Sequence, residues 1–281
     1  MKTLIANTDM AAAWDGEEGE NWASHWQWHD RAVGEYQEPL FSAAGITSHD
    51  DVLDVGCGNG QSTRLAASTA ADGHATGIDL SSRMLDRARE LAGREGLRNI
   101  SFVRGDAQVY PFEPGTYDLV LSRFGVMFFG DQEAAFTNIA RAIRPGGRLA
   151  MVAWQSLEAN EWLREIREAL ALGRELAVPP SGAPGPFGLA DQQQTQSVLT
   201  KSAFRDITIE ACKRGFLVGQ DMDEAFRFMS SSGLTRGLLA DLDPEDQARA
   251  LANLRSTLQT HETARGVVFG SAVWVISATR A

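Results

Sequence analysis

The middle of the chain alternates between short apolar runs and segments whose apolar residues recur at helical spacing. The apolar runs, rich in β-branched residues, predict strands at 52–55, 75–79, 100–106, 117–122 and 148–154. The segments between them predict helices at 60–72, 81–94 and 131–143. Strands that alternate with helices in this way form right-handed βαβ units. We therefore expect a parallel sheet covered by helices on both faces.

The pattern differs on either side of this region. Apolar residues at helical spacing predict a helix over 18–41, whereas the first 13 residues show no clear pattern. Beyond 154 the pattern predicts helices at 158–174, 221–232 and 243–259, and strands at 207–211 and 267–277. Residues 178–188 contain four prolines and three glycines and predict a loop. A loop this long is usually functional or mobile.

Composition and charge narrow the function classes. The 281 residues fit one large domain, or a core with a substantial addition. With 37 acidic and 26 basic residues the formal net charge is −11, which disfavours nucleic acid and anionic membranes as partners. No segment approaches the roughly 18–20 apolar residues of a membrane helix, and the start lacks the apolar run of a signal peptide. We expect a cytoplasmic protein with two free cysteines.

A glycine-rich turn follows the first predicted strand. The segment VLDVGCGNG places Asp54 just before Gly56, Gly58 and Gly60. Glycine permits positive φ angles and lets a ligand lie against the backbone, and the following helix start offers free N–H groups. The spacing G-x-G-x-G is one residue shorter than the dinucleotide fingerprint, and no P-loop motif occurs. The alternative reading is a tight turn that only packs strand on helix.

Two further acidic residues follow the next strands. Asp79 lies 19 residues beyond Gly60, where a carboxylate can accept hydrogen bonds from ribose hydroxyls. Asp106 follows the third strand, where it could accept from an adenine amino group. Taken singly, Asp79 could cap the next helix and Asp106 could be an ordinary loop residue. Because ligands of open α/β sheets bind at the carboxyl ends of the strands, the three features together favour a nucleoside-containing ligand.

These motifs resemble those of the class I S-adenosylmethionine-dependent methyltransferases. The resemblance covers residues 51–154 through DVLDVGCGNGQSTRLA, GIDLSSRMLDRARE, FVRGDAQVYPFEPGTYDLVLSRFGVMFF and IARAIRPGGRLAMVAW. The flanking layout resembles the ubiquinone and menaquinone biosynthesis C-methyltransferases. The resemblance implies an α/β, Rossmann-like, doubly wound sheet of seven strands with the last antiparallel. It further implies a helical cap over 1–48 and a cofactor-binding domain over 49–281, with lid insertions at about 156–200 and 216–262.

The resemblance also implies which residues bind the cofactor S-adenosylmethionine, and that S-adenosylhomocysteine is the product formed from it. They are Asp54, Gly56, Cys57, Gly58, Gly60, Asp79, Leu80, Met84, Asp106, Ala107 and Ser122. The sequence after Ser122, RFGVMFF, departs from the N-P-P-Y type of many amide and DNA adenine N-methyltransferases, which counts against those substrates. We expect in-line methyl transfer to a small aromatic or apolar metabolite, with alignment of the reactants as the main catalytic effect.

Candidates for the acceptor site come from the cap, the segment after the fourth strand and the Pro-rich loop. They are Trp22, Trp26, Met127, Phe128 and Phe187. Four tryptophans lie within 14–28, and the alternative is that they only pack the cap onto the sheet. His29 shares the Trp22 face and is a candidate general base. His25 and His29 have metal-ligand spacing, but no third ligand is evident, so we expect no metal.

Two other functions are compatible with the sequence. A protein that binds the cofactor without methylating would carry the same motifs, since a fold does not fix a reaction. An NAD(P)-dependent oxidoreductase is disfavoured by the shortened glycine motif and by Asp106. We expect a small-molecule substrate, with neither nucleic acid nor membrane as a partner, and a homodimer is possible.

Overall fold

The computed structural model describes residues 4–178, 180 and 182–281. The first three residues of the predicted cap, and positions 179 and 181 of the predicted loop, lie outside the described residues. In the described part, seven strands follow one another in the order β3-β2-β1-β4-β5-β8-β6. Their bounds are β1 Asp51–Val55, β2 His74–Asp79, β3 Ile100–Arg104, β4 Tyr117–Arg123, β5 Ile143–Trp154, β6 Phe204–Gly219 and β8 Gly266–Arg280. A two-residue strand, β7 (Glu262–Thr263), pairs with β8.

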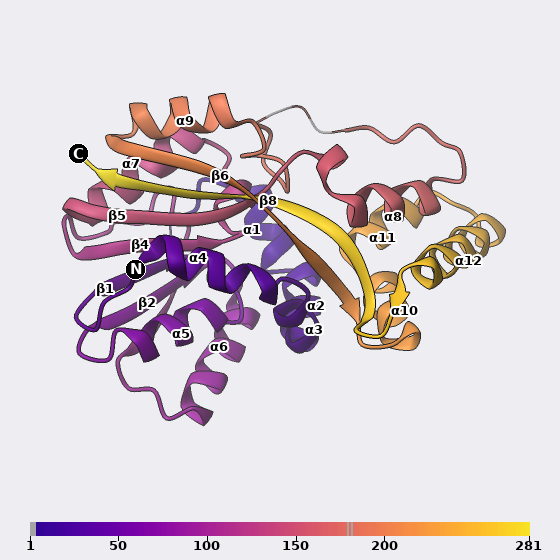
Figure 1. Ribbon diagram of the computed structural model, residues 1–281, viewed down its shortest axis with the longest axis horizontal. Coiled ribbons are helices and arrows are strands. Elements are labelled where there is room, and N and C mark those ends of the chain that lie inside the picture. The colour runs from indigo at the N-terminus through magenta and orange to yellow at the C-terminus, as the bar shows by residue number, and fades with distance from the viewer. Residues whose placement is uncertain (1–3, 179, 181) are drawn as a thin grey trace.

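The strand directions confirm the predicted α/β fold. Strands β1 to β5 pair in parallel, whereas β8 is antiparallel to both β5 and β6. The central strands are buried because their runs are continuously apolar, as in Val52–Leu53 and Leu119–Leu121. In Figure 1, α4 (Gln37–Ala44) passes in front of the strands and α7 (Gln132–Ala142) behind them. The sheet thus has helices on both faces.

The helices between the strands lie close to their predicted positions. They are α5 (Gln61–Thr69), α6 (Ser82–Arg94) and α7. Ser81 caps α6 by accepting a hydrogen bond from Met84 N–H. Each of these helices begins directly after a strand or its loop, so the helix starts lie near the carboxyl ends of β1, β2 and β4.

The single helix predicted over 18–41 is wrong. The N-terminal region forms α1 (Thr8–Trp14), α2 (Glu17–Ser24), α3 (Trp26–Ala32), a 3₁₀ turn (Gly34–Tyr36) and α4. His25 leaves the helical conformation with φ −109° and ψ 30°, and its ring nitrogen Nδ1 contacts the carbonyl of Asn21. Helical spacing of apolar residues does not register such a one-residue break. The structure also places a helix at 8–14, where the sequence shows no clear pattern.

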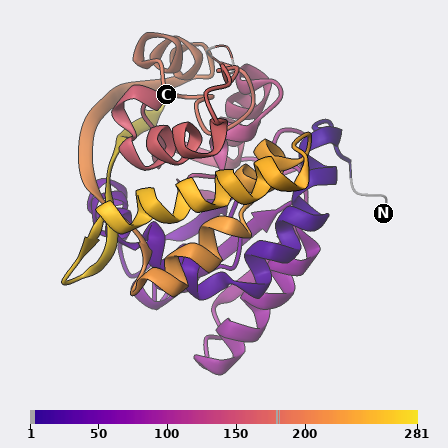
Figure 2. The same cartoon turned by 90° about the vertical axis from the view of Figure 1, so that its right-hand side faces the viewer.

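The C-terminal part builds a layer of helices beyond the end of the sheet. It contains α8 (Glu161–Ala171), α10 (Met222–Ser230), α11 (Gly233–Leu239) and α12 (Pro244–Thr260). Figure 2 shows α12 crossing this side of the molecule between α8 and α10. Strands β6 and β8 are 16 and 15 residues long and reach into this layer (Figure 1), so both exceed their predicted lengths. Helix α9 (Gln192–Lys201) and helix α11 were not predicted.

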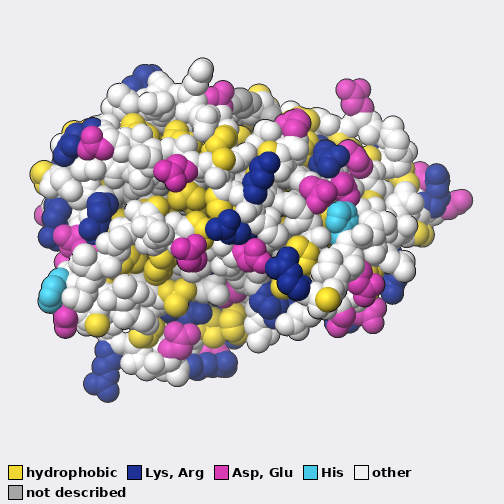
Figure 3. Space-filling view, in the orientation of Figure 1, with side chains coloured by type: hydrophobic (Ala, Val, Ile, Leu, Met, Phe, Trp, Pro, Cys, Tyr) yellow, Lys and Arg dark blue, Asp and Glu magenta, His cyan; other side chains and the backbone are white. Residues whose placement is uncertain are grey.

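Charged side chains of both signs are interspersed over the face seen in Figure 3, with small apolar areas between them. Within the described residues, no helix has the length and apolar character that a membrane crossing requires.

Candidate functional site

The glycine turn has the conformation that the sequence predicts. Gly56, Gly58 and Gly60 have φ angles of 68°, 53° and 77°, which other residues rarely adopt. A Cβ on Gly56 would lie 2.6 Å from the Cα of Gly125 in the segment after β4. A Cβ on Gly60 would lie 2.8 Å from the Cβ of Ala88. Both the backbone angles and these close approaches therefore require glycine.

Asp79 joins two of the loops at this edge. Its Oδ2 accepts a hydrogen bond from Gly58 N–H at 2.8 Å, and its Oδ1 accepts from Ser81 N–H at 2.9 Å. The side chain is buried, and desolvation raises its pKa while these backbone N–H groups oppose the rise. Since Ser81 caps α6, Asp79 is not required as the cap.

Asp106 is covered by the N-terminal segment. Its Oδ2 accepts hydrogen bonds from Ala6 N–H and Asn7 N–H at 2.9 and 3.0 Å, and its Oδ1 accepts from Gln108 N–H. Asn7 also donates through Nδ2 to the carbonyl of Phe128. The start of the described chain thus lies over the ends of β3 and β4.

Asp54 is the least satisfied acid of the group. Its Oδ2 accepts from Thr63 Oγ1 at 2.6 Å, while its buried Oδ1 has no hydrogen-bond partner. Burial raises its pKa to about 7, and Asp79 adds to the rise while Thr63 and Arg123 oppose it. A buried carboxylate oxygen without a hydrogen-bond partner can accept from a cationic donor such as an ammonium group.

The remaining residues assigned to the cofactor lie in the same loops or beside them. Ser122 Oγ donates to the carbonyl of Val55 at 2.7 Å and so ties β4 to β1. Burial raises the pKa of the Cys57 thiol, so it stays protonated and packs. Met84 Sδ lies 3.7 Å from the position of a Cβ on Gly58. Leu80 and Ala107 follow the ends of β2 and β3. The structure thus brings the sequence-predicted set together at the carboxyl ends of β1 to β4.

Part of the predicted acceptor set forms an aromatic cluster. Trp22 stacks on His29 with ring centroids 3.7 Å apart. Trp14 contacts both Trp22 and Phe128 edge-on, at 5.6 and 5.3 Å. The cluster links the N-terminal helices to the segment after β4. Trp14 belongs to it although it was not among the predicted site residues.

His29 is buried in this cluster and has an unusual environment. Its pKa falls to about 3, mainly because burial disfavours the charged ring and also because His25 is near. Its Nε2 is buried without a hydrogen-bond partner, and Phe228 meets the ring edge-on at 5.0 Å. The imidazole is therefore neutral at physiological pH.

The other predicted acceptor residues lie in two separate places. Met127 is buried and its Sδ accepts from Trp154 N–H at 3.4 Å, while Phe187 packs against the core from the Pro-rich loop. The loop is tied to Met127 by Gly185 N–H, which donates to its carbonyl. Trp26 lies elsewhere, because the helix breaks at His25. It lines a cavity of about 210 Å³ between α3 and α5, together with Gln27, Asp30, Arg31, Gln61 and Arg64.

A second aromatic cluster was missed by the sequence reasoning. Phe124 stacks on Trp154 at 4.2 Å, Trp162 stacks on Phe216 at 4.4 Å, and Tyr36 meets both Phe124 and Trp154 edge-on. Phe124 has φ 62°, a strained angle for a non-glycine residue that is often found at functional sites. The five rings come from separate segments, so spacing along the chain does not connect them. For two of the five the sequence offers a signal, since Phe124 lies in the RFGVMFF segment and Trp154 ends β5.

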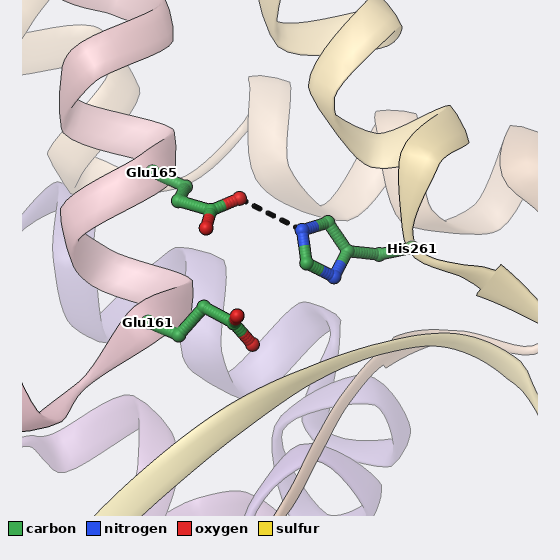
Figure 4. Close-up of side chains that lie close together, drawn as sticks. All are labelled: Glu161, Glu165 and His261. Carbon is green, nitrogen blue, oxygen red and sulfur yellow. Dashed lines mark hydrogen bonds and ion pairs between the residues drawn. The ribbon is translucent and has the colours of Figure 1, made fainter.

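One group of potential metal ligands lies away from these loops. Figure 4 shows Glu161 and Glu165 on α8 facing His261, and their ligand atoms lie within 4.8 Å of one another. All three side chains have protein partners. His261 Nε2 lies 2.8 Å from Glu165 Oε2, and Glu161 Oε2 accepts from Gly270 N–H at 2.5 Å. These contacts tie α8 to the end of α12 and to β8, which accounts for the arrangement.

The strand order, the short glycine turn and the acids after β2 and β3 define a class of protein. They are the features of the class I, S-adenosylmethionine-dependent methyltransferases. Residues 52–147 match the model of the methyltransferase domain family. Residues 52–147 are therefore assigned to a methyltransferase domain.

The chain is also similar to curated relatives over part of its length. The chain is 37% identical over 115 residues to an uncharacterized protein of Mycobacterium tuberculosis, covering 41% of each chain. It is 34% identical over 102 residues to the demethylmenaquinone methyltransferase of Lactococcus lactis, covering 36% of this chain and 40% of that one. The match spans about two fifths of the length of these curated relatives.

A likeness in fold to a solved structure extends beyond the matched domain. Phosphoethanolamine N-methyltransferase 2 of Haemonchus contortus, in complex with S-adenosyl-L-methionine, superposes with a TM-score of 0.59. The alignment covers 99% of this chain and 60% of that one, at 20% identity. This likeness shows the fold of the flanking parts as well as of the matched domain.

Proposed function

We propose that this protein transfers a methyl group from S-adenosylmethionine to a small, largely apolar or aromatic metabolite. One observation supports this most directly: the unpartnered Oδ1 of buried Asp54 beside three glycines with positive φ, inside a methyltransferase domain. When bound, the cofactor supplies a methyl group on a positively charged sulfur. Residues of the chain itself would hold the cofactor and the acceptor against each other.

The loops after β1 to β3 would divide the cofactor among them. Asp54 and the glycine turn would hold the methionine part, with Asp54 Oδ1 accepting from the ammonium group. Asp79 would bind the ribose, since its carboxylate already lies against the turn through Gly58 N–H. Leu80 and Met84 would pack near the adenine. Asp106 and Ala107 would bind the polar edge of the adenine, and Asp106 would then exchange hydrogen bonds now made with residues 6 and 7.

The acceptor would lie between the cap and the segment after β4. Trp22 and Phe128 would supply apolar walls there, and Met127 and Phe187 would close the side formed by the Pro-rich loop. We retain Trp26 as a substrate-binding candidate at the cavity between α3 and α5. The proposed catalytic work is alignment of the reactants and exclusion of water, which requires no triad.

His29 would act as a hydrogen-bonding group rather than as a general base. A base with a pKa of about 3 holds a proton weakly near neutral pH. Its unpartnered Nε2 can orient a hydroxyl or amine of the acceptor.

We further propose residues 1–48 as the cap, and about 156–200 and 216–262 as lids, of one cofactor-binding domain over 49–281. The cap reaches the domain through Asn59 Nδ2, which donates to the carbonyl of Trp22, and through Asp15, which accepts from Ser82. A cytoplasmic location and a homodimer stay predictions from the sequence.

The proposal is tested with purified protein and radiolabelled S-adenosylmethionine against a panel of small aromatic and isoprenoid compounds. Release of S-adenosylhomocysteine that depends on one compound of the panel, with label in that compound, would support methyl transfer. Tight S-adenosylmethionine binding with no transfer to any compound would favour a binding protein. NAD(H) binding without S-adenosylmethionine binding would overturn the proposal.

A further inference from the structure

Arg123, at the end of β4, is a buried cation on the same side of the sheet as Asp54. Asp54 pairs in register with Leu121, and Arg123 lies two residues further along the same strand. Because side chains alternate along a strand, Arg123 and Asp54 point to the same face. The Arg123 side chain is only 10% exposed.

The hydrogen bonds of Arg123 connect it to the glycine turn. Its Nη1 donates to Gln61 Oε1 at 2.6 Å, and Gln61 is the first residue of α5, directly after Gly60. The same Nη1 donates to Gln37 Oε1 at 2.8 Å. Its Nη2 lies 3.7 Å from Asp30 Oδ1, which is beyond the roughly 3.2 Å of a normal hydrogen bond. The guanidinium therefore has donors left to satisfy.

Three buried polar atoms without a hydrogen-bond partner belong to residues that surround this arginine. They are Asp54 Oδ1, Asp30 Oδ2 and Gln37 Nε2. Asp30 is 9% exposed, and burial raises its pKa against the pull of Arg123 and Arg64. Since buried polar groups are nearly always hydrogen-bonded, several neighbouring polar atoms without partners indicate that a polar ligand binds there. The 210 Å³ cavity lined by Asp30 and Gln61 borders the same cluster.

We propose that this cluster binds the amino-acid end of the cofactor, with Arg123 and Gln37 Nε2 donating to its carboxylate and Asp54 accepting from its ammonium. The inference rests on the proposed function and adds two binding residues to it. The cluster matches a zwitterion. Gln37 Nε2 is a buried donor without a partner, Arg123 Nη2 lies beyond hydrogen-bond distance of Asp30, and Asp54 Oδ1 is a buried acceptor without a partner. The incoming carboxylate replaces Asp30 as the partner of Arg123.

Two ligands separate this site from the adenosine site. S-adenosylhomocysteine carries the amino-acid end, whereas 5′-methylthioadenosine has the same adenosine and a sulfur but no amino-acid end. Binding of both is measured by calorimetry with wild-type protein and with Arg123→Gln. Arg148→Gln is the matched control, because Arg148 also pairs with a buried acid, Asp50, in the same sheet but away from these loops.

Arg123→Gln should bind S-adenosylhomocysteine at least about tenfold more weakly, as expected for losing hydrogen bonds between charged groups. Its affinity for 5′-methylthioadenosine should stay within about twofold of wild type, and Arg148→Gln should bind both ligands like wild type. Asp30→Asn should bind S-adenosylhomocysteine at least as tightly as wild type, because a competitor for Arg123 is removed.

Unchanged affinity of Arg123→Gln for S-adenosylhomocysteine would overturn the assignment. Equal losses for both ligands would mean that Arg123 supports the fold, and Arg123→Lys, which keeps the charge, would then have to restore only S-adenosylhomocysteine binding for the inference to survive. A large loss in Asp30→Asn would place the ammonium on Asp30 instead. If wild-type protein binds neither ligand, the proposed function itself fails.

Discussion

The raised pKa of Asp54 predicts that cofactor binding depends on pH. Burial raises this pKa to about 7, so near neutrality a large part of the protein carries a protonated Asp54. An ammonium group is held by the ionised carboxylate, so binding must first remove this proton. We therefore expect S-adenosylhomocysteine to bind more tightly as the pH rises from 6 to 8.

The magnitude follows from the pKa. With a value of about 7, about one protein in ten has an ionised Asp54 at pH 6 and most have it at pH 8. The apparent Kd should therefore be about tenfold higher at pH 6 than at pH 8, which is about 1.4 kcal/mol. Calorimetry in buffers of different ionisation enthalpy should also show release of up to one proton per ligand below pH 7.

Two controls isolate Asp54 from Asp79, whose pKa is also raised by burial. Asp54→Asn cannot titrate at this position and should bind S-adenosylhomocysteine weakly, with little pH dependence over the same range. The affinity for 5′-methylthioadenosine, which lacks the ammonium group, should not follow the pH in either protein. An affinity of wild-type protein for S-adenosylhomocysteine that is flat between pH 6 and 8 would refute the reasoning.

The raised pKa of Asp54 also makes the stability of the protein depend on pH. The folded pKa of Asp54 lies above its unfolded value of 3.8, so the folded state binds the proton more tightly. This contribution to the free energy of unfolding is complete below pH 3.8 and is lost as the pH rises through about 7. The full shift corresponds to about 4 kcal/mol. Urea unfolding should thus show Asp54→Asn gaining stability relative to wild type between pH 5 and 8; a constant difference would contradict this.

Three further predictions test other parts of the site. Asp79→Ala should weaken S-adenosylmethionine binding by about tenfold or more, or about 1.4 kcal/mol, and unchanged affinity in calorimetry would remove Asp79 from the site. Trp22→Ala should raise the KM for the acceptor with little change in Tm if the aromatic cluster is a pocket wall; a large drop in Tm with unchanged kinetics would show that it only packs the cap. Gly56→Ala should lower Tm and cofactor affinity together, because its φ is 68° and a Cβ would meet Gly125 at 2.6 Å, and a Tm equal to that of wild type would show that the turn relaxes freely.

The sequence predicted best those features that depend on short stretches of chain. The glycine turn, the Ser81 cap and the parallel strands β1 to β4 each follow from fewer than about ten adjacent residues, where backbone preference and burial act together. Strand β6 was predicted too short, because alternate positions are exposed along much of its length and its charged residues interrupt the apolar run. The N-terminal helix was predicted as continuous because the helical spacing of its apolar residues continues across the turn at His25.

The site residues that the sequence did not provide are defined by long-range contacts. Phe124 and Trp162 join an aromatic cluster whose members come from five separate segments: the 3₁₀ turn before α4, the segment after β4, the end of β5, α8 and β6. Arg123 gives no signal in the sequence, because its role depends on a glutamine 86 residues earlier and on another 62 residues earlier. An arginine at the end of a strand is otherwise an ordinary surface residue.

Hydrogen bonds hold the N-terminal segment against the loops after β1, β2 and β3. The N-terminal segment bonds to the loop after β1 through Asn59, to the start of α6 through Asp15 and to the end of β3 through Asp106. Each bond uses a polar group that lies at the carboxyl edge of the sheet. A ligand that takes Asp106 as its partner must therefore displace residues 6 and 7, and the free energy of that exchange is part of its affinity. For the same reason, the affinity for a ligand at Asp106 should depend on the N-terminal segment as well as on the loops.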